Sequence, residues 1–296
     1  MAHKHAVGPD VENAVKQKQM KLKTMNTKIS LSIVWVIAAL SLSACAQDSL
    51  SASDDAGNYS SWGMGNSSGN QASAGIGLGP WSFINSTPDG GYAGEYLGTS
   101  IGQDPTAPYN INSGNGDAWG FYANSAAFTT SQAIAPFTGS LGVYQTFDIA
   151  MQNYFVGTGT TNGFNLQNSS GGNLFSFYFV GGQSDYYIDV GGTQYGTGLG
   201  FTTNGLTLAF TQGTGDNWSF KISGPTVATI TLTSGSTGML ANNNISQVDM
   251  FNATGSGGGG LQYNTYFNNI QIVPEPWTLT LMGLAGMALV VLRRRT

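Results

Sequence analysis

The chain has 296 residues, of which only 8% are charged, and its formal net charge is −5. Between residues 46 and 273 the single basic residue is Lys221 against twelve acids, so this part carries a net charge of −11. Nucleic acids and anionic membranes require clustered cations, which excludes both as partners of this part. The only cysteine is Cys45 and no histidine follows His5, which excludes internal disulfides and histidine-dependent catalysis in the same part.

The N-terminal residues have the pattern of a secretory signal. Three lysines, Lys21, Lys23 and Lys28, precede an apolar run over residues 29–42, and small residues follow it. This order of basic, apolar and small residues is typical of an export signal. We therefore predict a signal peptide over 25–46, read by the secretion translocon. Residues 1–24 lack any such pattern and are a candidate mis-called extension.

Two cleavage sites fit the small residues. Ala44, Cys45 and Ala46 suit signal peptidase cleavage before Gln47. The stretch 42–45 also resembles the lipobox of bacterial lipoproteins, which would leave Cys45 lipidated at the new N-terminus. Simple cleavage is favoured, because a lipid anchor would duplicate the C-terminal one described below.

The exported part consists of a polar lead-in and one domain. Residues 47–79 are poor in apolar side chains, and we predict a flexible lead-in that ends in a first strand. Residues 80–273 are enough for one β-domain. Apolar residues alternate in period two along several stretches, and turns rich in Gly, Asn, Asp and Ser separate them. The clearest stretches are 173–180, 206–212, 218–223 and 228–233.

This pattern predicts an all-β fold in which many short strands, each with one apolar face, pack as a jelly-roll β-sandwich. The stretches "DAWGFYANS", "FTGSLGVYQTFDIAM", "NLFSFYFVGG" and "ISQVDMFNATGSGGG" resemble a recurrent domain related to the concanavalin A-like lectin/glucanase sandwich. The resemblance runs from about residue 58 to 273. It implies a concanavalin A-like fold and raises carbohydrate as the ligand class.

Glycan cleavage is the enzymatic alternative. Glucanases of that fold use paired Glu around an Asp, whereas residues 46–273 contain one Glu, Glu95, and no Glu-x-Asp-x-x-Glu. Asp185 and Asp189 lie four apart on one predicted strand, so their side chains share a face but stand about 13 Å apart. That separation suits neither glycosidase mechanism. We therefore expect the chain not to be an enzyme.

Two further groups of acids are candidates for other roles. A candidate calcium site consists of Asp89, Glu95, Asp104 and Asp117, which lie in Gly-rich loops and supply the hard oxygen ligands that calcium takes. The alternative is that they are solvated turn residues. Asp249 lies in an apolar strand, where an isolated carboxylate would be costly unless it is hydrogen-bonded or paired with a metal. The alternative is that its side chain faces solvent while its neighbours Val248 and Met250 face inward.

Aromatic side chains are the candidates for sugar contact. Trp119 and Trp218 alternate with apolar neighbours, which places them in the core. Tyr186, Tyr187 and Tyr195 are flanked by "GGQSD" and "GGTQ" turns. We expect these three tyrosines to be exposed and name them as candidate ligand contacts.

The C-terminal residues have the pattern of a membrane-sorting tail. Val273, Pro274, Glu275 and Pro276 precede an uncharged run over 277–292, and the cluster Arg293, Arg294 and Arg295 follows. A helix over this run reaches about 24 Å, slightly short of a hydrocarbon core, and the arginines mark its cytoplasmic end. The arrangement resembles the PEP-CTERM sorting signal, which implies processing at 274–296 by an exosortase-type membrane transpeptidase.

Together these features predict an exported bacterial cell-surface or extracellular-matrix protein. It would be held transiently in the membrane by its C-terminal helix and would be non-catalytic, with polysaccharide as its candidate ligand. The alternatives are a purely structural matrix protein and a glycan-cleaving enzyme that uses Asp carboxylates.

Overall fold

The computed structural model describes Gln17 and residues 50–65, 67–88, 91–103, 109–124, 128–238, 240, 244–254 and 264–273. All of these except Gln17 belong to one compact unit, Ser49–Glu275. The predicted signal peptide and sorting tail lie outside the described residues. Within the described ranges, no helix is both long and apolar enough to span a bilayer.

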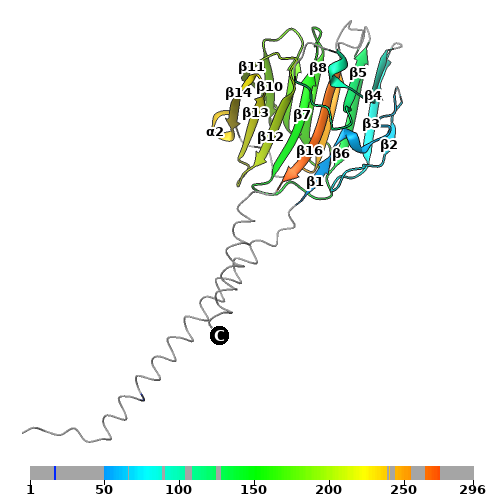
Figure 1. Ribbon diagram of the computed structural model, residues 1–296. Helices are drawn as coiled ribbons and strands as arrows, with labels where there is room; N and C mark the ends of the chain where they lie inside the picture. Colours follow the sequence, from blue (N-terminus) through cyan, green and yellow to red (C-terminus); the bar gives the residue numbers. More distant parts are fainter. Residues whose placement is uncertain are drawn as a thin grey trace, which may run out of the picture. The chain divides into compact units, whose positions relative to one another are not determined.

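The unit is a sandwich of two antiparallel sheets (Figure 1). The first sheet has the order β14-β13-β12-β7-β16-β5-β4, and β1 pairs with β16. Its strands are β1 (Ala52–Asp54), β4 (Tyr92–Gly98), β5 (Ala118–Asn124), β7 (Thr146–Asn153), β12 (Leu206–Gln212), β13 (Trp218–Gly224), β14 (Val227–Thr233) and β16 (Thr265–Val273). This arrangement confirms the predicted all-β sandwich.

The second sheet has the order β11-β10-β9-β8-β15-β6-β3-β2. Its strands are β2 (Gly69–Gln71), β3 (Trp81–Ser86), β6 (Thr130–Pro136), β8 (Thr161–Gln167), β9 (Asn173–Val180), β10 (Asp185–Val190), β11 (Thr193–Gly200) and β15 (Gln247–Ala253). The helices described within the unit are short: η1 (Ala56–Asn58), η3 (Ser100–Gln103) and α2 (Ser234–Thr237).

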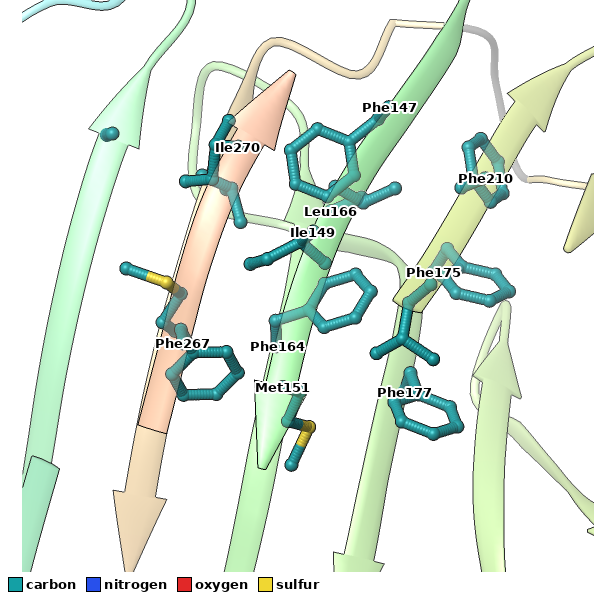
Figure 2. Close-up of a cluster of buried hydrophobic side chains, with 14 of the residues drawn as sticks. Phe147, Ile149, Met151, Phe164, Leu166, Phe175, Phe177, Phe210, Phe267 and Ile270 are labelled. Atoms are coloured by element: carbon teal, nitrogen blue, oxygen red, sulfur yellow. The ribbon is translucent and has the colours of Figure 1, made fainter. Parts of the chain in front are cut away.

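The core lies between the sheets and is built by the predicted alternation. Figure 2 shows side chains of β7, β12 and β16 pointing into the same layer as those of β8 and β9. Phe175 contacts two rings of the opposite sheet, with centroids 4.8 Å from Phe210 and 4.9 Å from Phe220. The predicted core positions Trp119 and Trp218 are buried, which confirms them. Because successive strand residues face opposite sides, every second residue of the second sheet points away from this core.

The described part of segment 47–79 packs against the core, although its polar composition predicts a flexible lead-in. Its first strand, β1, lies near the start of the segment. Tyr59 explains much of this order, because its hydroxyl donates to the Asp54 carboxylate at 2.5 Å and accepts from Trp81 Nε1 at 2.8 Å. Trp62 is buried against Trp81, with ring centroids 5.5 Å apart.

Candidate functional site

The outward surface of the second sheet gathers polar and aromatic side chains into two cross-strand rows. We call the surface formed by these rows the outer face. One row follows the register Asp249↔Asn165↔Ser176↔Asp189↔Gln194 across β15, β8, β9, β10 and β11. The adjacent row follows Gln132↔Phe251↔Gly163↔Tyr178↔Tyr187↔Gly196 from β6 to β11. Hydrogen-bonding groups and rings therefore run side by side across five strands.

Asp249 stands at one end of the polar row and is almost fully buried, at 2% exposure. Its Oδ2 accepts hydrogen bonds from Asn165 Nδ2 at 2.9 Å and from Gln167 Nε2 at 3.2 Å. Gln132 Nε2 makes a longer contact of 3.5 Å to the same oxygen. The other oxygen, Oδ1, is buried without a hydrogen-bond partner. Burial is the main cause that raises the pKa of this carboxyl to about 7, and the Asn165 amide opposes the rise.

Of the two alternatives for Asp249, the structure shows the hydrogen-bonded carboxylate. Val248 and Met250 face the core and are fully buried, as the alternation indicates. The carboxylate faces the other side, but side-chain amides of β6 and β8 cover it, so it does not face solvent. The residues that carry these amides are distant from Asp249 in the sequence, since Asn165 is separated from it by 84 positions and Gln132 by 117.

Two tyrosines form the aromatic part of the face. The rings of Tyr178 and Tyr187 are stacked, with centroids 6.2 Å apart and planes inclined by 29°. Both residues are partly exposed. Burial, followed by the Asp189 charge, raises the pKa of Tyr178, so its hydroxyl stays protonated at neutral pH and keeps a hydrogen-bond donor. The Tyr187 hydroxyl donates to Gln183 Oε1 at 3.3 Å.

The structure places the three predicted ligand contacts in different environments. Tyr187 lies on the outer face. Tyr186 is fully buried, so its prediction as an exposed ligand contact is wrong. Its position in the alternation is in phase with the buried Ile188 and Val190, and this signal was present in the sequence. Tyr195, on β11, is partly buried and packs against the hydrophobic core.

The acids proposed for calcium are not brought together among the described residues. Asp89 and Asp104 lie outside those residues. Glu95 is buried, and its two oxygens accept hydrogen bonds from Ser131 Oγ at 2.8 Å and Asn85 Nδ2 at 3.1 Å. Asp117 directly precedes β5, whereas Glu95 of β4 pairs with Phe121 inside β5. In the part of the chain that the structure describes, no three Asp, Glu, His or Cys side chains form a group suited to a metal ion.

The carboxylates of the outer face are widely spaced. Asp185 and Asp189 both lie on this side of β10, as the alternation predicts. Asp249 and Asp189 are three strands apart in the same row, which corresponds to about 14 Å at the usual strand spacing. That exceeds the separation of roughly 5–9.5 Å between paired glycosidase carboxyls. Asp249 is therefore a single perturbed carboxyl rather than half of an Asp249–Asp189 pair.

No protein-family model matches the chain, and no curated protein matches it. Solved structures of similar fold include a glycosyl hydrolase family 16 protein from Mycobacterium smegmatis, at 10% identity and a TM-score of 0.36, over 62% of this chain and 76% of that chain. The catalytic domain of an endo-1,3-β-glucanase from Thermotoga petrophila aligns at 9% identity and a TM-score of 0.35, over 71% and 95%.

A family 11 carbohydrate-binding module from Clostridium thermocellum aligns at 9% identity and a TM-score of 0.31, over 66% of this chain and 89% of that chain. At such identities the matches concern the β-sandwich fold alone. Several of the similar structures are glycoside hydrolases, so a fold shared with enzymes corrects our expectation that the chain is not one, and it assigns no activity to this chain.

Proposed function

We propose that this domain recognises an uncharged polysaccharide on the outer face of the second sheet. The observation that carries the proposal is the register that sets the Tyr178–Tyr187 pair beside the row from Asp249 to Gln194. An aromatic ring packs on the C–H surface of a sugar ring. Carboxylates accept hydrogen bonds from the sugar hydroxyls, and side-chain amides both donate to them and accept from them. Tyr178, Tyr187 and Asp189 are partly exposed and Gln194 is exposed, so these residues offer both kinds of contact, whereas Asn165, Ser176 and Asp249 are buried.

The charges of the face favour an uncharged ligand. Its ionisable carboxyls are those of Asp185, Asp189 and Asp249. The one basic residue among the described ranges is Lys221, which lies on β13 of the first sheet. A polyanionic polymer would therefore meet like charges on this face without a compensating cation.

The test is retention of the protein on a panel of insoluble polysaccharides, with Tyr178→Ala and Tyr187→Ala as variants. Each variant should lose about tenfold in affinity, since loss of a stacking ring removes apolar contact as well as a hydroxyl. Tyr92→Ala is the matched control, because Tyr92 is an exposed tyrosine on β4 of the first sheet. Absence of retention on every polysaccharide would reject the proposal and leave a structural matrix protein.

Glycan cleavage is the second candidate function, and Asp249 favours it. A buried carboxyl with a pKa of about 7 is protonated in part at neutral pH and is suited to donate a proton to a leaving group. Cleavage would release reducing ends from a retained polysaccharide, and Asp249→Asn would abolish the release. If no retained polysaccharide yields reducing ends, this second candidate fails and recognition stands.

The terminal segments add a cellular location to the proposal. The basic, apolar and small residues of 25–46 support export through the secretion translocon. The Pro-Glu-Pro stretch, apolar run and Arg293–Arg295 support sorting by an exosortase-type transpeptidase to the cell surface or matrix. Mass spectrometry of the mature protein tests both, since cleavage at 46/47 and near Pro274 gives defined termini, whereas an intact chain would contradict the proposed processing.

A further inference from the structure

Only one of the two carboxylate oxygens of Asp249 accepts hydrogen bonds. Its Oδ2 takes all three amide contacts, from Asn165, Gln167 and Gln132, whereas Oδ1 takes none and is buried. A buried acceptor without a donor is costly, and an ionised one more so. The same carboxyl lies in the polar row of the outer face. A ligand hydroxyl on this face would supply the missing donor.

Gln132 is the most easily displaced of the three amides around this carboxyl. Oδ1 is closed off from solvent, so a ligand reaches it only when a neighbouring side chain moves. Of the three amides, Gln132 makes the longest contact, 3.5 Å, and is partly exposed. Asn165 and Gln167 are buried and make shorter bonds. Displacement of Gln132 therefore costs the least.

We infer that a hydroxyl of the bound glycan displaces Gln132 and donates a hydrogen bond to Asp249 Oδ1, so that glycan binding is coupled to ionisation of Asp249. This inference rests on the proposed polysaccharide recognition. The donor favours the carboxylate over the carboxylic acid, since an ionised acceptor gains more from a hydrogen bond. Affinity then rises with pH as Asp249 ionises, and binding below that range releases a proton.

Few other ionisable groups lie near Asp249. Asp249 pairs with Ile134 of β6 and with Asn165 of β8, and its other side-chain contacts are the amides of Gln132 and Gln167, none of which is ionisable. Asp185 and Asp189 are carboxyls on β10, two strands beyond β8. Glu95, whose pKa burial raises to about 6, bonds Ser131 of β6, which points to the opposite side from Gln132. Variants of these groups separate their contribution from that of Asp249.

The experiment measures affinity between pH 5.5 and 8.5 for soluble oligosaccharides of glucose, mannose and galactose. Tryptophan fluorescence or calorimetry gives the affinity, and calorimetry in buffers of different ionisation enthalpy counts the protons released. With a carboxyl pKa of about 7, the wild-type affinity should rise about tenfold from pH 6 to pH 8.

Asp249→Asn is the decisive variant. The buried amides require an oxygen at the Oδ2 position, which leaves the new NH₂ at the Oδ1 position as a donor where the ligand needs an acceptor. The variant should bind about tenfold more weakly at pH 8 and show no pH dependence. Glu95→Gln, whose carboxyl lies away from the outer face, should retain the wild-type pH profile. Circular dichroism confirms that each variant is folded.

The outcomes separate the two proposals. A flat wild-type profile, or an Asp249→Asn variant with wild-type affinity and profile, overturns the coupling and leaves polysaccharide recognition standing. Gln132→Ala gives a second readout, because its affinity should equal or exceed that of the wild type; a tenfold loss would also overturn the inference. Failure of the wild type to bind any of the sugars at any pH overturns recognition and the coupling together.

Discussion

Phe177 and Tyr186 stack with parallel rings whose centroids lie 5.2 Å apart, inside the sandwich. The Tyr186 hydroxyl is satisfied there by Asn153 Nδ2 at 3.3 Å. Its neighbour Tyr187 lies on the outer face. Two adjacent tyrosines therefore have opposite roles, one in the core and one at the candidate site.

Truncation of the two tyrosines should separate these roles. Tyr186→Ala removes a fully buried ring and should lower the free energy of unfolding by about 3–5 kcal/mol. Tyr187→Ala should lower it by less than about 1 kcal/mol, because the ring is partly exposed. Urea denaturation measures both values. Equal losses in the two variants would contradict the assignment of Tyr186 to the core and Tyr187 to the face.

Gly163 is required by the close approach of β8 and β9. A Cβ at this position would lie 2.1 Å from the Phe177 carbonyl oxygen, which is backbone and has little room to move. Gly163→Ala should therefore cost about 1–3 kcal/mol or more in the free energy of unfolding. Gly196 lies in the same row, and its nearest Cβ neighbour, Asp185 Oδ2, is 3.6 Å away. Gly196→Ala should be nearly neutral, and similar losses for both substitutions would count against this register.

Asp249 should make the ligand-free domain less stable as pH rises. Its pKa is about 7 in the folded state against 3.8 for an unperturbed Asp, so between these values the folded state binds more protons than the unfolded state. The contribution of Asp249 to the free energy of unfolding therefore decreases from about pH 4 to pH 7 and is constant outside that window. The whole decrease is at most about 4 kcal/mol. Asp249→Asn should remove this decrease in urea titrations at fixed pH. A variant that keeps the full decrease would show that Asp249 is not the group responsible.

Glu95 should contribute a smaller step of the same sign. Burial is the largest cause that raises its pKa from 4.5 to about 6, against the lowering effects of Asn85 and Ser131. Stability then falls between about pH 4.5 and pH 6, by at most about 2 kcal/mol. Glu95→Gln should leave the parts due to Asp249 and to Asp148, whose pKa burial also raises. If the profile between pH 4.5 and 6 is unchanged in Glu95→Gln, the assignment of this step fails.

The strands could be predicted from the sequence because their information is local. The alternation in "NLFSFYFV" places Phe175, Phe177 and Phe179 on one side, and the structure buries all three. The same rule shows that Tyr186 and Tyr187 face opposite sides. Reading the phase of Ile188 and Val190 would have shown which of them is buried. The error arose from the weight given to the flanking glycine-rich turns.

The site could not be predicted in the same way because it depends on pairing between distant strands. Asp249 is covered by amides from β6 and β8, and nothing local to "VDMFN" indicates Asn165 or Gln132 as partners. The Tyr178–Tyr187 pair likewise depends on the register of β9 with β10. The lead-in was expected to be flexible for a related reason, since the hydrogen bond from Trp81 to Tyr59 spans 22 positions.

Hydrogen–deuterium exchange with and without a retained polysaccharide tests most directly whether the second sheet is the binding surface. The account predicts slower exchange in the ligand complex for peptides of β8, β9, β10 and β15, with no change in β12, β13 and β14. Protection confined to the first sheet, or an unchanged second sheet in a saturated complex, would contradict the assignment of polysaccharide recognition to the face that carries Tyr178, Tyr187 and Asp249.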